Sequence, residues 1–179
     1  MNPPTSHLDA EALYTRLLEA VRGLLGELPA DRTHLVGIHS GGSWIADRLH
    51  RDLGLPDAPG KLDISFYRDD YARIGLHPQV KPSAISFDVD DKHLIVVDDV
   101  LYTGRTIRAA MNELFDYGRP ASIKLAVLVD RGGRELPIAA DIAAATIDLA
   151  PGQNLVLSRV GDAFKLDFEN LPAQEPHHA

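Results

Sequence analysis

One continuous run, residues 94–106, constrains this chain more than any other part of its sequence. The run opens with four apolar residues, 94–97, whose length and β-branched composition are typical of a buried strand of a parallel sheet. Asp98 and Asp99 follow where we expect that strand to end. A helix is expected after a short polar turn, because apolar residues then recur at helical spacing: Ile107, Ala110, Met111 and Leu114.

The polar turn between this strand and this helix has the chemistry of a phosphate site. A helix N-terminus carries roughly +0.5 of an elementary charge and N–H groups without partners, which suit phosphate oxygens. Hydroxyl groups add donors, and a glycine lets the backbone approach a ligand closely. We therefore predict that the turn binds a ribose 5-phosphate through Tyr102, Thr103, Gly104, Arg105 and Thr106.

Asp98 and Asp99 would repel a phosphate directly. They suit two vicinal sugar hydroxyls, or a hard cation such as Mg2+ held through oxygen. The alternative is that the pair caps a helix or faces solvent, as isolated Asp pairs often do. Neither a GxxxxGK[ST] nor a GxGxxG sequence is present, which argues against a P-loop nucleotidase and a dinucleotide-binding domain.

The whole run resembles the phosphoribosyl diphosphate (PRPP) motif of type I phosphoribosyltransferases. Residues 97–119 and 125–137 are moreover similar to the PyrR family, pyrimidine-operon attenuation regulators that are also uracil phosphoribosyltransferases. Residues 35–38 and 63–70 are also similar to this family, so the similarity spans about residues 8 to 141. The resemblance implies an α/β type I phosphoribosyltransferase fold: a parallel-centred sheet flanked by helices, with a small hood and a flexible hairpin loop.

The resemblance also implies an activity, in which uracil and PRPP give UMP and pyrophosphate with Mg2+ as cofactor. Asp98 and Asp99 would be the catalytic pair and, with Asp130, the metal ligands. An RNA leader transcript is a further partner in the family, and a homodimer or higher homo-oligomer is expected.

A second turn, Ser40, Gly41 and Gly42, is the candidate pyrophosphate cradle, since glycines let consecutive N–H groups point at a ligand. An ordinary strand-to-helix turn is the alternative. The chain departs here from the family pattern, Thr-Arg-Gly, because Gly41 stands in place of the arginine. That replacement removes a bidentate phosphate contact.

Asp130, Arg131 and Arg134 follow another apolar strand and should reach the same sheet edge. By resemblance, Asp130 and Arg131 belong to the base or Mg2+ region and Arg134 contacts pyrophosphate. The alternative is an Asp–Arg salt bridge that organises a turn. A second departure, residues 144–146 (Ala-Ala-Thr) in place of Gly-Lys-Asn, weakens the expectation of contacts to uracil.

Residues 68–83 have little periodicity and are interpreted as a mobile loop, with residues 84–89 as its returning arm. The family has a flexible loop at this place, so Arg68 or Arg73 would close on pyrophosphate. A plain charged hairpin is the alternative.

Composition predicts a single domain, because 179 residues with 45% hydrophobic content can bury one sizeable core. The resemblance implies that it is a phosphoribosyltransferase domain, over residues 1–171. Residues 172–179 are expected to be disordered, and their two histidines to fray rather than bind metal. The absence of cysteine excludes disulfides, thiolate catalysis and Cys-based zinc sites. With no signal-like or membrane-length apolar run, we expect a cytoplasmic protein without membrane contact.

The net charge of −8, from 26 acidic and 18 basic residues, argues against a surface that binds nucleic acid all over. Four arginines stay available for RNA, although solvated helix faces explain them as well: Arg16, Arg22, Arg48 and Arg51. Two alternatives to the uracil enzyme therefore stay open. One is an RNA-binding regulator that senses UMP or PRPP with weak or no catalysis, and the other is a phosphoribosyltransferase for a purine base.

Periodicity and turn residues place the remaining elements. Helices are expected over residues 8–26, with Ser6 as N-cap, and after residue 43. Strands are expected at 34–38, 62–66, 94–97, 123–129, 140–147 and 155–157. This alternation predicts a parallel-centred α/β sheet flanked by helices.

Overall fold

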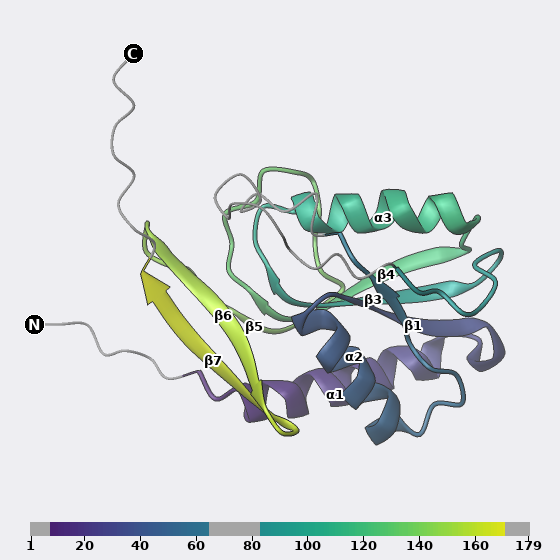
Figure 1. Ribbon diagram of the computed structural model, residues 1–179, viewed down its shortest axis with the longest axis horizontal. Helices are drawn as coiled ribbons and strands as arrows, with labels where there is room; N and C mark the ends of the chain where they lie inside the picture. Colours follow the sequence, from purple (N-terminus) through teal and green to yellow (C-terminus); the bar gives the residue numbers. More distant parts are fainter. Residues whose placement is uncertain (1–7, 65–82, 171–179) are drawn as a thin grey trace, which may run out of the picture.

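The computed structural model describes residues 8–64 and 83–170. Its centre is a five-stranded parallel sheet of order β2-β1-β3-β4-β5 (Figure 1). The sheet strands are β1 Thr33–Ile38, β2 Gly60–Leu62, β3 His93–Leu101, β4 Ser122–Asp130 and β5 Ile142–Thr146. The other elements are α1 Ala10–Glu27, a short 3-10 helix Ala30–Arg32, α2 Gly41–Leu53, α3 Arg105–Tyr117, β6 Gln153–Val160 and β7 Ala163–Asn170.

Helix α3 covers one face of the sheet, and α1 and α2 cover the other (Figure 1). Successive side chains of a strand point to opposite faces, so a strand contributes side chains to two hydrophobic cores, one on each face of the sheet. Ile95 and Val97 pack with α1 and α2, whereas Leu94 and Val96 pack with α3. The predicted parallel-centred sheet flanked by helices is confirmed.

Helix α1 buries one apolar face, with Leu13, Leu17 and Val21 at most 5% exposed. Its N-cap is Asp9, whose Oδ1 accepts from the N–H groups of Glu11 and Ala12 at 3.0 and 3.1 Å. The prediction of Ser6 as N-cap was therefore wrong, because Asp9 satisfies the free N–H groups three residues later. Within the described residues, no helix is both long and apolar enough to cross a membrane.

Within residues 8–64 and 83–170, strands β6 and β7 pair only with each other, and they form an antiparallel hairpin, here called the hood hairpin. Sequence analysis predicted a strand only at 155–157 and missed β7. The alternation of Phe164 and Leu166 with polar neighbours is the period-2 signal that would have found it. Both side chains are buried against the core that includes α1, so the hairpin is fastened to the domain by packing.

Segments around the predicted mobile loop differ from expectation. Strand β2 ends at Leu62, and Ile64 is buried outside it. Of the expected returning arm 84–89, Ala84 alone pairs, through an isolated bridge to Lys61. The loop itself, with Arg68 and Arg73, lies outside the described residues, as does the tail from residue 172.

Candidate active site

Strand β3 runs through Asp98 and Asp99 and ends at Leu101, so the prediction that the strand ends before this pair was wrong. Pairing explains the difference. The last pair between β1 and β3 is Gly37 with Val97, whereas β4 pairs with β3 as far as Leu101. The two carboxylates therefore lie on a strand whose β1 side is open to another element.

Alternation along β3 sends the two carboxylates to opposite faces of the sheet. Asp98 shares the α3 face with Val96 and is 2% exposed, and its Oδ1 accepts from the Asp99 N–H at 3.0 Å. Asp99 points to the α2 face and is half-buried, and its Oδ1 accepts from the Val100 N–H at 3.0 Å. The pair thus presents one carboxylate to each side of the sheet edge.

The predicted pyrophosphate cradle packs directly on this pair. A β-carbon at Gly41 would lie 2.6 Å from Asp99 Cγ, and one at Gly42 would lie 3.0 Å from Asp98 Cα. Gly41 and Gly42 are already in the first turn of α2, with Ser40 as its N-cap, so the prediction of a helix starting after residue 43 was wrong. Only residues without a side chain let the helix begin this close to β3.

The predicted phosphate turn forms the N-terminus of α3. Thr103 is buried, and its Oγ1 accepts from the Arg105 N–H at 3.2 Å. Gly104 has a φ of 92°, which only glycine adopts readily, and Thr106 is half-buried in the first helical turn. The Arg105 side chain pairs with Glu135, Nη2 to Oε2, at 2.7 Å. Sequence analysis missed Glu135 as a partner of this turn.

Asp130 and Arg134 form the ion pair that sequence analysis kept as an alternative. Arg134 Nη2 lies 2.7 and 2.6 Å from the two carboxylate oxygens of Asp130, and the Gly132 N–H donates to Oδ1 at 3.0 Å. Burial by itself raises the pKa of Asp130, but these donors outweigh it and the pKa is lowered. Arg134 also donates to the main-chain oxygen of Tyr102, so the pair braces the phosphate turn.

The chain is similar in sequence to known proteins along most of its length. The family model described as Phosphoribosyl transferase domain matches residues 8–151. "Bifunctional protein PyrR" of Nitrosococcus oceani is 50% identical over 158 residues, which are 87% of this chain and 89% of that protein. The chain belongs to the PyrR family of phosphoribosyltransferases. The Pseudomonas aeruginosa PyrR is 52% identical over 145 residues, 81% of this chain and 85% of that protein.

Solved structures support the fold of this PyrR-family chain. A hypoxanthine phosphoribosyltransferase from Staphylococcus aureus superposes with a TM-score of 0.63 at 18% identity, covering 80% of this chain and 78% of that one. A Leishmania tarentolae HGPRT-ase in complex with GMP gives 0.61 at 20% identity, covering 82% and 83%. The expected type I phosphoribosyltransferase fold is confirmed, and the protein is a phosphoribosyltransferase of PyrR type.

The remaining predicted residues of the PyrR-type site lie at the same edge or outside the described residues. Ala145 and Thr146 on β5 pair with Val129 and Asp130, so the departure from Gly-Lys-Asn faces the site edge. Arg131 turns to the hood hairpin, where it bonds residues that sequence analysis missed: Gln153 and Asn154. Nothing in the local sequence signals these contacts, because the partners are 22 and 23 positions away.

Proposed function

We propose that this protein transfers the phosphoribosyl group of PRPP to uracil, giving UMP and pyrophosphate. The observation that carries the proposal is the meeting of three groups at one sheet edge: the Ser40–Gly42 turn, the Asp98–Asp99 pair and the turn from Tyr102 to Thr106. Uracil as the base rests on membership of the PyrR family. A chain without cysteine needs no oxidising compartment for its fold, which suits the cytoplasmic location that we propose.

The reaction requires no covalent nucleophile. The bond from ribose C1 to pyrophosphate breaks, its electron pair leaves with the pyrophosphate oxygen, and a nitrogen of uracil bonds to C1 and gives up its proton. Positive charge develops on the ribose as in glycosidic cleavage. Asp98 and Asp99 accept hydrogen bonds from the ribose hydroxyls and stabilise the developing positive charge. The turn from Thr103 to Thr106 holds the 5-phosphate.

Mg2+ fits this site as an ion that binds together with the substrate phosphates. Among the described residues, no three His, Cys, Asp or Glu side chains gather in a way that would hold a metal ion. Mg2+ commonly binds one or two carboxylates together with substrate phosphates, and Asp98 and Asp99 would supply those carboxylates. Both oxygens of Asp130 already accept from Arg134, so Asp130 suits the ion less well. When bound, Mg2+ neutralises charge on the leaving pyrophosphate.

The test is PRPP-dependent conversion of labelled uracil to UMP, with and without Mg2+, with hypoxanthine and guanine in parallel. We expect Mg2+-dependent UMP and no purine nucleotide. Product from a purine would overturn the assignment of the base. Absence of any product, with PRPP or UMP still binding, would support the sensing role instead.

A nucleotide-sensing regulator that binds an RNA leader is the second candidate function, favoured by the word "bifunctional" in the names of the relatives. The charge pattern opposes it. Of the arginines that sequence analysis left for RNA, Arg22, Arg48 and Arg51 pair with the carboxylates of Glu19, Glu11 and Asp162. Titration of a pyrimidine-operon leader transcript at several salt concentrations tests this function, since phosphate contacts weaken steeply with salt.

A further inference from the structure

Arg131 lies one residue beyond β4, and its side chain joins two parts of the site that are far apart in sequence. Nη1 donates to Asn154 Oδ1 at 2.9 Å, and Nη2 donates to the main-chain oxygen of Gln153 at 2.8 Å. Its Cζ lies 4.0 Å from the centroid of the Tyr102 ring. One guanidinium therefore contacts both the root of β6 and the first residue of the phosphate turn.

The loop that follows β4, residues 131–134, makes further contacts at Tyr102. Gly133 has a φ of 73°, and a β-carbon there would lie 3.0 Å from Cδ2 of the Tyr102 ring. Arg134 donates to the main-chain oxygen of Tyr102. The Arg131 N–H donates to the main-chain oxygen of Leu101 at 3.0 Å. Ring and backbone at Tyr102 are thus fixed to the loop that carries Arg131.

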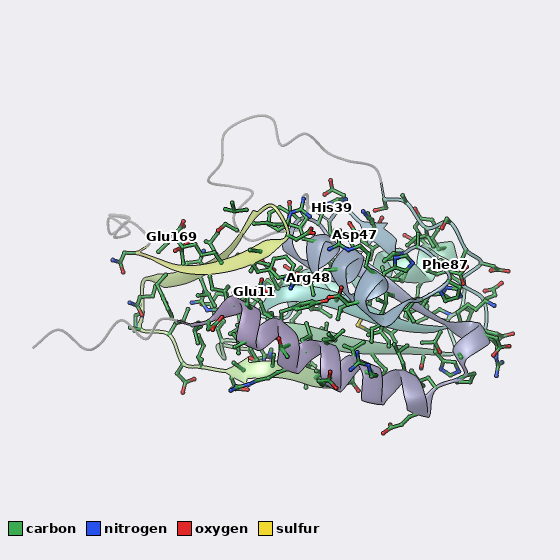
Figure 2. All side chains as sticks on the ribbon, turned by 90° about the horizontal axis from the view of Figure 1, so that it is seen from below. Glu11, His39, Asp47, Arg48, Phe87 and Glu169 are labelled. Carbon is green, nitrogen blue, oxygen red and sulfur yellow. The ribbon has the colours of Figure 1, made fainter. Side chains whose placement is uncertain are left out.

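Side-chain hydrogen bonds add to the apolar packing that holds the hood hairpin, whose two strands pair with no strand of the central sheet. Its far end is held by Arg48, which donates to the Asp162 main-chain oxygen at 3.1 Å, and by Glu11, which accepts from the Phe164 N–H at 2.7 Å. Figure 2 shows Glu11 and Arg48 close together and Glu169, which pairs with Asn154, toward the other end of the hairpin. Arg131 is the attachment at the end next to the site.

We propose that Arg131 is a positioning residue that couples the phosphate turn to the hood hairpin. Both terminal nitrogens donate to the hood and the guanidinium stacks on Tyr102, so Arg131 acts through these partners rather than as a ligand of the substrate. Lysine cannot replace it, since an ammonium group lacks the planar fork that bonds two acceptors while stacking on a ring.

The coupling sets where the base binds, and this consequence rests on the proposed phosphoribosyl transfer. The turn at Thr103 takes the 5-phosphate and the turn at Gly41 takes the pyrophosphate, so the hood root and the end of β5 are left for the base. Loss of the Arg131 contacts should therefore raise the KM for the base more than the KM for PRPP.

The test compares Arg131→Gln and Arg131→Lys with the unchanged protein by steady-state kinetics and by amide hydrogen exchange. We expect both variants to raise the KM for uracil at least fivefold, with less than a twofold change in the KM for PRPP. Exchange in residues 150–157 should become about tenfold faster. Asn154→Ala, which removes one acceptor and leaves Arg131 in place, should show the same pattern more weakly and serves if the Arg131 variants fold poorly.

Two matched variants separate coupling from loss of charge or of hood attachment in general. Arg159→Gln removes an arginine of β6 whose Cζ lies 5.2 Å from the centroid of the Trp44 ring, and it should leave both KM values and the exchange at 150–157 unchanged. Arg48→Gln releases the far end, so its faster exchange should centre on residues 161–166.

A ligand experiment keeps the inference distinct from the proposed function. PRPP added without a base should slow exchange at residues 150–157 in the unchanged protein and not in Arg131→Gln. A protein that binds PRPP and shows this difference, yet makes no UMP, would refute uracil transfer while supporting the coupling. Unchanged exchange in Arg131→Gln, or an equal rise in both KM values, would overturn the role of Arg131.

Discussion

Gly41 lies against the carboxylate of Asp99, so closely that a β-carbon at position 41 would come within 2.6 Å of Asp99 Cγ. The glycine at the start of α2 and the acidic pair of β3 therefore form one packed unit. In the family pattern that sequence analysis expected, an arginine stands at this position. The geometry of this chain leaves no room for that side chain while Asp99 keeps its place.

Substitution of Gly41 by Ala should force Asp99 out of position and lower kcat/KM for phosphoribosyl transfer by at least tenfold. Gly23→Ala is the matched control, because a β-carbon there meets nothing within 4 Å. Since Gly23 lies within α1, its replacement should stabilise the fold by about 0.5–1 kcal/mol and leave transfer unchanged. Full activity of Gly41→Ala would show that the close packing is not needed for turnover.

Neutralising the acidic pair in Asp98→Asn/Asp99→Asn should reduce turnover by about 100-fold or more, because the developing positive charge loses both partners. Asn keeps an acceptor oxygen, so the free energy of unfolding should fall by only about 1 kcal/mol. Asp116→Asn, exposed on α3, is the control for a lost charge. Unchanged kcat in the double variant would refute the catalytic role.

Breaking the half-buried ion pair with Arg134→Gln should lower the free energy of unfolding by about 1–2 kcal/mol at pH 7, since Asp130 loses both hydrogen bonds from the guanidinium and keeps the one from the Gly132 N–H. The exposed pair of Arg22 and Glu19 provides the control, and Arg22→Gln should cost about 0.5 kcal/mol or less. Urea unfolding measures both. Equal losses of unfolding free energy in the two variants would mean that the Asp130–Arg134 pair stabilises the fold no more than an exposed ion pair does.

The contribution of Asp130 should also depend on pH, because its pKa in the folded protein is below the ordinary value of 3.8. A lowered carboxyl pKa means that the unfolded chain takes up the proton first as the pH falls. The stabilisation is therefore complete above pH 3.8 and is lost as the pH drops through the folded-state pKa. Arg134→Gln should show a smaller loss over this acidic range, and an identical pH profile would contradict the assignment.

His34 gives a second pH dependence, nearer neutrality. Its ring is buried and stacks on Phe87 with centroids 4.1 Å apart, and burial lowers its pKa below 6.5 despite Asp57 nearby. The unfolded chain then binds the proton more readily, so stability should fall as the pH decreases from 6.5 toward the folded-state pKa. His34→Gln should remove this dependence between pH 7.5 and 5.5 in urea unfolding. If the stability of His34→Gln still falls between pH 7.5 and 5.5, another group causes the pH dependence.

Local order in the sequence was enough to predict the position of the turn at residues 102–106. Residues 94–106 are contiguous, and strand, turn and helix each have their own periodicity, so no distant contact was needed to place Thr103 and Thr106 at the start of α3. The same reasoning placed helices over most of α1 and α2. It failed at element ends, because pairing with β4 carries β3 on to Leu101 and close packing on β3 lets α2 begin at Gly41.

The sequence by itself determined the class of fold and the residues that gather at the carboxyl edge of the sheet, since both follow from patterns within short stretches. The tertiary structure alone decided which of these groups touch. It set Asp99 on Gly41 and sent Arg131 to Gln153 and Asn154 of the hood hairpin. These contacts join residues on different elements, and their geometry is fixed by how strands and helices pack, which no local pattern encodes.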